Sequence, residues 1–198
     1  MLGLERFDIP HSLGSSHGVN RIIRLAYYED PSYVPLLRRA YELWRELEQG
    51  FGEQLLHITG SIDASEGDSW LFEQSRLSCE LHNLPYEVLS NTELNARFPA
   101  YHLPSGHLAL LQPEGGFVAS ELAIVAHVEG ALEHGAEIHA REAVTGWELK
   151  GDGVAVETTR GRYEASKLVL SAGAWMGDLT PMLAPLLVRE RQVLAWFQ

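Results

Sequence analysis

The chain has 198 residues, of which 45% are hydrophobic and 21% are charged, a composition typical of a globular protein made of one ordinary domain or parts of two. Its 15 basic and 27 acidic residues give a net charge of −12, which argues against nucleic acid as a partner because phosphates would be repelled. No apolar run approaches the roughly 20 residues of a membrane-spanning helix, and the first residues do not read as a secretion signal, so we expect a cytoplasmic protein without a membrane partner.

The predicted elements begin with a loop, rich in Gly, Pro, Ser and His, that runs to about residue 20. A helix is expected from Tyr33 to about Gly50, because apolar residues recur there at spacings of three and four. Further along the chain we predict a strand over 55–62, a helix over 66–82, a strand over 86–89 and a short helix over 91–98. Gly60 interrupts the first strand, and Pro99 ends the last helix.

The periodicity changes after residue 120. Ser120 can cap a helix, whose buried stripe we expect to consist of Leu122, Val125, Val128 and Leu132. Beyond that helix, alternating apolar residues over 154–158 lie between turn sequences at 151–153 and 160–161, which predicts three short antiparallel strands.

A continuous apolar run, Leu168-Val169-Leu170, is typical of a parallel strand covered on both faces. It breaks at the small residues 171–173, before a helix that we expect to start near Trp175. Small residues at the carboxyl end of such a strand allow the backbone to approach a ligand, although plain packing of strand on helix would also favour them.

The densest set of polar side chains lies in residues 14–24, Gly-Ser-Ser-His-Gly-Val-Asn-Arg-Ile-Ile-Arg. If Arg21 and Arg24 lie on a helix, their spacing of three places both guanidinium groups on one face, where they can bind a carboxylate or phosphate. The alternative is that both arginines are solvated surface charges. Residues 14–18 also match the G-x-S-x-G pattern of a serine hydrolase, with Ser16 as nucleophile, but too few residues precede Gly14 to build the required sheet.

Other site patterns are not expected from this sequence. The nine histidines lack the spacing of zinc ligands, so we predict no metal site. The glycines do not form the G-x-G-x-x-G pattern of a dinucleotide-binding turn. Cys79 is interpreted as an ordinary free thiol.

Residues 10–11 and 14–27 resemble the FAD-dependent amine oxidases that include monomeric sarcosine oxidase, N-methyl-tryptophan oxidase and pipecolate oxidase. The resemblance covers nearly the whole chain as an internal fragment. The family's N-terminal Gly-rich turn and its C-terminal flavin-linked cysteine fall outside it. Further support comes from Tyr33–Leu36, Gly116-Phe117, Ser120–Leu122, Ser171–Trp175 and Arg191-Gln192.

This resemblance implies an α/β (α+β) fold. It would comprise part of a Rossmann-like FAD-binding domain, with a three-stranded β-meander, and part of a mixed-sheet substrate domain. We expect the FAD-binding part to consist of residues 1–55 and 119–187, and the substrate part of residues 56–118 and 188–198.

The resemblance also assigns roles to individual residues. Arg24 is similar to the arginine that pairs with the substrate carboxylate, while Arg21 and His17 are similar to residues beside the flavin, where positive charge stabilises the reduced ring. These three are the predicted catalytic residues. The predicted cofactor-binding residues are Ser15, Ser16, His17, Arg21, Val144, Ser171, Ala172, Gly173 and Trp175.

The activity implied for the intact protein is oxidation of a secondary or N-methyl amino acid to an imine, with hydride transfer to FAD and reduction of molecular oxygen to hydrogen peroxide. Two alternatives stay open. The chain could be a non-catalytic domain without flavin, because the turn that binds the pyrophosphate falls outside it, or part of a flavin-dependent amino acid dehydrogenase. Surfaces left uncovered by the absent segments predict self-association.

Overall fold

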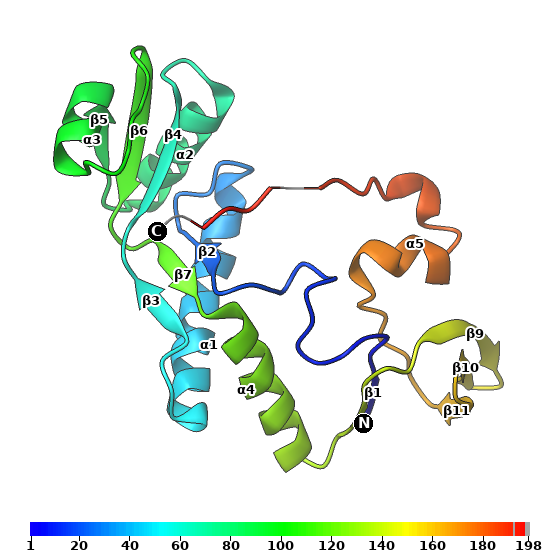
Figure 1. The fold of residues 1–198 in the computed structure, drawn as a ribbon. Helices are drawn as coiled ribbons and strands as arrows, with labels where there is room; N and C mark the ends of the chain where they lie inside the picture. Colours follow the sequence, from blue (N-terminus) through cyan, green and yellow to red (C-terminus); the bar gives the residue numbers. More distant parts are fainter. Residues whose placement is uncertain (192, 197–198) are drawn as a thin grey trace. The chain divides into compact units, whose positions relative to one another are not determined.

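The computed structural model describes residues 1–191 and 193–196, so Gln192 lies outside the described residues (Figure 1). The chain divides into two compact units. One consists of Met1–His17 with Val128–Gln198, and the other of Gly18–His127. The assignment of segments to a flavin part and a substrate part uses other boundaries and stays a prediction.

Two antiparallel sheets of three strands each build the unit Gly18–His127 (Figure 1). The first has the order β2 (Arg21–Ile23), β7 (Gly116–Val118) and β3 (Leu56–Ile58). The second has the order β4 (Ser61–Glu66), β6 (His107–Gln112) and β5 (Glu87–Ser90). The strands predicted over 55–62 and 86–89 are thereby confirmed, the first being divided at Gly60 into β3 and β4.

The three predicted helices of this unit are also confirmed. They are α1 (Val34–Phe51), which follows the short 3-10 helix η1 (Pro31–Tyr33), α2 (Trp70–His82) and α3 (Asn91–Arg97). Their ends follow from capping: Gly52 takes a left-handed conformation after α1, Ser69 accepts a hydrogen bond from the backbone of α2, and Ser90 forms a capping box with Glu93.

The strand β6 is covered on both faces of its sheet. Its successive side chains point to opposite faces and enter two different apolar clusters. Leu110 packs with Phe72 of α2 in one apolar cluster, whereas Ala109 and Leu111 pack with Leu94 of α3 in another. The helices α2 and α3 therefore cover opposite faces of the β4-β6-β5 sheet.

The condition of a helix through Arg21 and Arg24 is not met. Arg21–Ile23 is extended and pairs with β7, and Arg24 follows the strand. The cause is the pairing with β7, whose residue Gly116 also lets the backbone of β3 approach closely on the other side. A Cβ atom at Gly116 would overlap the carbonyl oxygen of His57.

We therefore expect Gly116→Ala to lower the free energy of unfolding by about 2 kcal/mol, because the added methyl group meets rigid backbone. Urea denaturation would measure the change. Gly146→Ala is the matched control, since Gly146 also lies in a strand and a Cβ there meets nothing within 4 Å. Equal stability of the two variants would contradict the role of Gly116.

The second unit contains a parallel pair of strands, β1 (Leu2–Leu4) and β8 (Glu137–His139), in a region where we had expected only loop at the N-terminus. The predicted meander is confirmed: β9 (Val144–Lys150), β10 (Gly153–Thr158) and β11 (Arg162–Ala165) form an antiparallel sheet in the order β11-β10-β9. Short helical turns follow at η2 (Gly173–Trp175), α5 (Met176–Leu179) and η3 (Ala184–Leu186).

Two expectations about the second half are wrong. Leu168–Leu170 is not a strand, and Val169 is 86% exposed, because no strand of the described residues pairs with this run. The helix α4 (Ser120–Glu133) forms as predicted but buries its small residues Ala123 and Ala126, whereas Leu132 of the expected stripe is 49% exposed. In both cases periodicity identified apolar residues but not the surface that would cover them.

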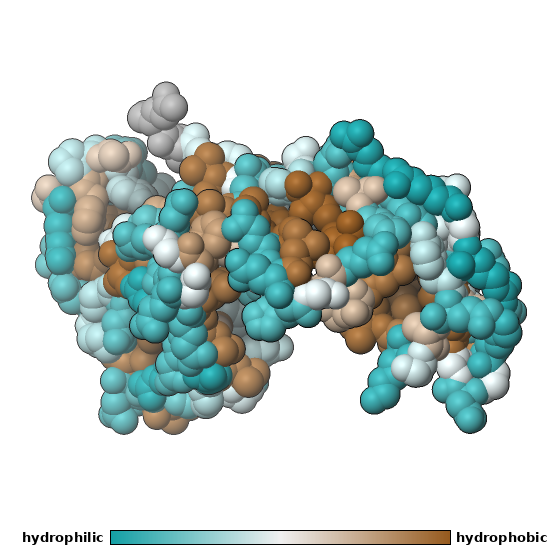
Figure 2. Space-filling model, turned by 90° about the horizontal axis from the view of Figure 1, so that it is seen from below, coloured by the Kyte–Doolittle hydropathy of each residue, from teal (hydrophilic) through white to brown (hydrophobic). Residues whose placement is uncertain are grey.

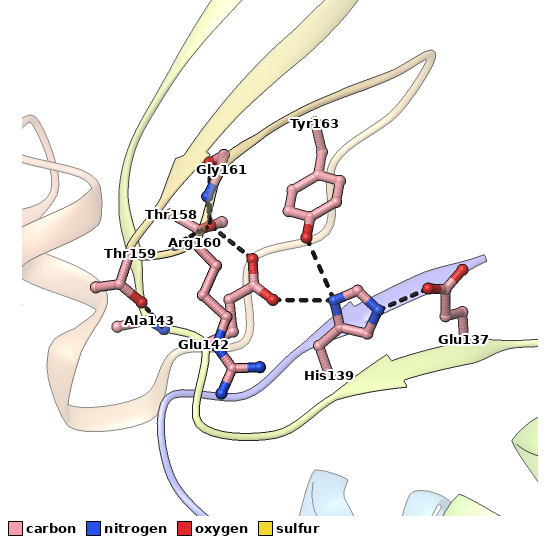
Figure 3. A network of polar contacts seen from close by, with 9 residues as sticks. All are labelled: Glu137, His139, Glu142, Ala143, Thr158, Thr159, Arg160, Gly161 and Tyr163. Atoms are coloured by element: carbon pink, nitrogen blue, oxygen red, sulfur yellow. Dashed lines mark hydrogen bonds and ion pairs between the residues drawn. The ribbon is translucent and has the colours of Figure 1, made fainter.

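A polar network ties β8 to the meander (Figure 3). The side chain of Glu142 is 1% exposed and accepts a hydrogen bond from the Thr158 hydroxyl at 2.6 Å. The other carboxylate oxygen lies 2.9 Å from Nδ1 of His139, whose Nε2 lies 2.6 Å from Glu137. Tyr163 closes the cluster, with its hydroxyl 3.4 Å from the same imidazole.

These contacts make the stability of the protein pH-dependent. Hydrogen bonds to Glu137 and Glu142 raise the pKa of His139, and the hydrogen bond from Thr158 lowers the pKa of Glu142. A raised histidine pKa stabilises the fold below the unfolded value of about 6.5, and this contribution is lost as the pH rises through the folded pKa. The contribution of Glu142 is instead lost as the pH falls through its lowered pKa.

We therefore expect the urea midpoint to fall as the pH rises from about 6.5 through the raised pKa of His139. The variant His139→Gln should show a flatter profile over this range. A variant with the same pH profile as the unchanged protein would rule out His139 as the titrating group.

Apolar residues reach the surface in both units, as the brown areas among the teal ones in Figure 2 show. Leu36 of α1, Leu81 of α2 and Leu149 of β9 are 68%, 61% and 78% exposed. Among the described residues, no helix combines the length and the apolar character that crossing a bilayer requires. Self-association through these surfaces stays a prediction.

Candidate active site

Arg24 lies in the unit Gly18–His127, directly after β2, and its position is fixed by the buried residues Leu25 and Ala26 that follow it. Its side chain is 19% exposed. The guanidinium carbon lies 4.8 Å from the ring centre of Tyr28 and 5.4 Å from that of Tyr27. Cation–π attraction to two rings therefore holds the positive charge in place.

Two carboxylates approach Arg24 without hydrogen-bonding to it. Asp63 Oδ1 lies 4.0 Å from Nε, and Glu29 Oε2 lies 3.9 Å from Nη2, both beyond hydrogen-bond distance. The Nε atom is buried and has no hydrogen-bond partner among the described residues. A buried, charged donor without a hydrogen-bond acceptor is unfavourable, so the Nε–H group can donate to an anion that enters the site.

Asp63 is held from the other side by α2. The hydroxyl of Ser75, a fully buried residue, donates a hydrogen bond of 3.0 Å to Asp63 Oδ2. Burial raises the pKa of Asp63, while the charge of Arg24 and the hydrogen bond from Ser75 oppose that rise. The site thus combines a fixed cation with a carboxylate that accepts a proton more readily than usual.

An aromatic surface borders this site. Trp70, the first residue of α2, packs edge-on against Tyr28 at 5.8 Å and is 58% exposed, and Tyr33 lies 5.0 Å from Tyr27. Sequence analysis missed Asp63, Ser75 and Trp70, because each lies about 40 residues or more from Arg24 and matches no local motif. The approach of β4 and α2 to the segment after β2 is what brings them together.

The other predicted residues are divided between the units. Arg21 lies in β2, in the same unit as Arg24. Ser15, Ser16 and His17 lie in the loop after β1, in the other unit, where both serines are exposed and His17 is half-buried.

The same unit also contains the predicted segment Ser171–Trp175, in which Gly173 takes a left-handed conformation. The structure brings Trp175 against the chain after β1. The Trp175 ring packs edge-on against Phe7 at 5.5 Å, and the Arg6 guanidinium lies 5.9 Å above it. Val144, the first residue of β9, is half-buried and pairs with Thr158.

A further residue of interest in this unit is Glu5, which sequence analysis did not select. It directly follows the parallel strand β1, and its Oε1 accepts a hydrogen bond of 2.8 Å from the backbone of Phe7. In Rossmann-type folds an acidic residue at the end of a parallel strand binds the ribose of a dinucleotide. The signal that could have found it is an acidic residue directly after the short apolar run Leu2–Leu4.

Two further features of the described residues lie apart from the predicted site residues. Burial raises the pKa of Cys79 to about 12, which leaves its thiol unreactive at neutral pH. An open cavity of about 440 Å³ in the unit that contains β1 includes none of the predicted site residues; it is lined by Arg6, Phe7, Asp8, Pro10, His11, Ser12, Leu13 and Arg141.

Comparisons with known proteins agree on one family. A family model described as FAD dependent oxidoreductase matches residues 2–196. The chain is 40% identical over its whole length to a monomeric sarcosine oxidase of Streptomyces avermitilis, and 36% identical over 189 residues to an N-methyl-L-tryptophan oxidase of Yersinia pestis. It covers 52% and 50% of these proteins, so it spans about half the length of the curated relatives it matches.

A solved structure gives the same result. NikD, described as an unusual amino acid oxidase essential for nikkomycin biosynthesis, superposes with a TM-score of 0.83 at 32% identity, over 93% of this chain and 47% of that one. Such neighbours have a Rossmann-like fold, which agrees with the parallel strands β1 and β8 and with the mixed α/β architecture. Because the family model matches almost every residue, the chain belongs to the FAD-dependent oxidoreductase family.

Proposed function

We propose that this chain forms part of an enzyme that oxidises a secondary or N-methyl amino acid with FAD, producing an imine and hydrogen peroxide. The observation that carries the proposal is the environment of Arg24, whose buried Nε has no hydrogen-bond partner among the described residues. A guanidinium held on two tyrosine rings can fix a substrate carboxylate by two-point contact. The relatives named for sarcosine and N-methyl-tryptophan support this substrate class.

The residues of the unit that contains β1 fit the adenosine end of FAD, since Glu5 occupies the position of a ribose-binding acid after a parallel strand. FAD supplies the redox chemistry when it is bound. In this proposal Ser15, Ser16 and Val144 contact the cofactor, together with residues 171–173 and Trp175. Residues 1–55 and 119–187 then form the FAD-binding part.

The remaining predicted residues act through charge. We assign His17 and Arg21 to the flavin side of the site, where positive charge would stabilise the reduced ring and raise its potential. Arg24 would orient the substrate so that its amine carbon faces the flavin. The aromatic surface at Tyr28 and Trp70 would contact the part of the substrate beyond the carboxylate.

The test is an absorption spectrum of the purified full-length protein that contains this chain, after incubation with FAD and desalting, followed by assays with sarcosine and N-methyl-L-tryptophan. The expected result is a retained flavin band that bleaches on anaerobic addition of substrate and returns with peroxide when oxygen is admitted. Bleaching that only an artificial electron acceptor reverses would identify a dehydrogenase instead. A colourless protein would favour the alternative of a domain that does not bind flavin.

A further inference from the structure

The charges around Arg24 oppose the binding of a further carboxylate unless one negative charge is removed. The guanidinium faces two carboxylates of the protein, Asp63 at 4.0 Å and Glu29 at 3.9 Å. When a ligand carboxylate binds Arg24, three anions surround one cation in a partly buried site. Because burial weakens the solvation of each charge, the third anion is unfavourable unless one carboxylate is neutralised.

Asp63 is the carboxylate that can be neutralised at the lower cost. Its side chain is 13% exposed, whereas that of Glu29 is 42% exposed and therefore better solvated. Oδ2 of Asp63 accepts the hydrogen bond from Ser75, which leaves Oδ1, the atom nearest Arg24, as the place for a proton. A protonated Oδ1 turns from an acceptor that repels an anion into a donor that can hydrogen-bond to it.

The groups that face Asp63 from each packed element support this assignment. The segment after β2 contributes Arg24, which favours the charged form, and Glu29, which opposes it. The helix α2 contributes Ser75 and the thiol of Cys79, whose pKa is raised to about 12 so that it stays neutral. In β6 the residue opposite Asp63 is the apolar Leu110.

We propose that a carboxylate ligand binds at Arg24 together with one proton, which Asp63 takes up from solvent. This inference rests on the proposed role of Arg24 and adds a regulation of the same site. Carboxylate affinity is then greatest at low pH and falls by about tenfold per pH unit above the point at which free Asp63 is ionised. Burial already raises the pKa of Asp63, and an additional nearby anion raises it further.

The test is calorimetric titration of the purified protein with methoxyacetate, which has the length of sarcosine but only the carboxylate as an ionisable group. The titration is repeated near neutral pH in Bis-Tris and in Tris, which differ in their ionisation enthalpies and add no buffer anion that competes for Arg24. We expect a buffer-dependent heat that corresponds to an uptake approaching one proton. Binding with a buffer-independent heat would overturn the proposal and leave the role of Arg24 intact.

Three variants identify the proton acceptor. Asp63→Asn should bind methoxyacetate without proton uptake and with a flat pH profile, whereas Glu29→Gln, the matched control, should keep the uptake. Ser75→Ala removes a hydrogen bond that favours charged Asp63, so the affinity should begin to fall at a higher pH. Uptake that persists in Asp63→Asn would overturn the assignment, and absence of binding at any pH would overturn the role of Arg24 together with this proposal.

Discussion

Arg24→Ala is expected to reduce kcat/KM for an N-methyl amino acid by roughly 100-fold or more, because truncating one partner of a buried charge pair costs several kcal/mol. The substrate carboxylate would lose its cation and would still meet Asp63 and Glu29, both within about 4 Å of the vacated position. Steady-state kinetics of the flavin-loaded enzyme would measure the loss, which should include a large rise in KM.

Two further variants sharpen this expectation. Arg24→Lys keeps the charge but not the planar pair of donors, so an intermediate loss is expected. Arg39→Ala is the matched control, because Arg39 is an exposed arginine whose ion pairs with Glu42 and Glu46 on α1 contribute little. Unchanged kinetics in Arg24→Ala, with the flavin retained, would show that the carboxylate binds elsewhere.

Glu142→Ala is expected to lower the melting temperature by roughly 10 °C, since it removes a buried carboxylate and leaves the half-buried side chains of Thr158 and His139 without their shared partner. The carboxylate of Glu142 joins Thr158 of β10 to His139 of β8, so its loss loosens the contact between the meander and the parallel strands (Figure 3). Differential scanning calorimetry would give the change.

The controls for Glu142 separate charge from shape. Glu142→Gln keeps the shape and one acceptor oxygen, so it should destabilise the protein less than Glu142→Ala does. Glu164→Ala removes an exposed carboxylate that pairs with Lys150 on the same sheet, and it should have little effect. A melting temperature equal to that of Glu164→Ala would contradict the structural role of Glu142.

Short sequence patterns correctly predicted the helices and strands whose signals lie within one short stretch of the chain. The helix α1 has its apolar residues at spacings of three and four, and the meander has turn glycines between alternating strands, so both could be read from short windows. The strand β2 could not, because its three residues become extended only through pairing with Gly116–Val118, nearly one hundred positions away. The strand predicted over Leu168–Leu170 does not form. Its sequence suits a buried strand, but no strand of the described residues pairs with it.

The candidate site also has a part that a local sequence motif predicts and a part that only the fold brings together. Arg24 lies in a dense local motif, and its resemblance to a substrate-binding arginine was visible in the sequence. Asp63, Ser75 and Trp70 reach it only because β4 and α2 pack beside the segment after β2. Sequence reasoning therefore found the residue that we propose binds a carboxylate, but not the residues that we propose set the strength and pH dependence of that binding.

The pairing of β1 with β8 also determines an order of events during translation. The ribosome completes residues 18–127 between these two strands, which at usual elongation rates takes on the order of ten seconds. The compact unit Gly18–His127 can fold in that interval, while Leu2–Leu4 still lacks β8, the strand with which it pairs in the structure. The nascent chain should therefore acquire the Arg24 site before it acquires the parallel strands, and synonymous codons that slow synthesis between residues 18 and 127 should prolong chaperone association.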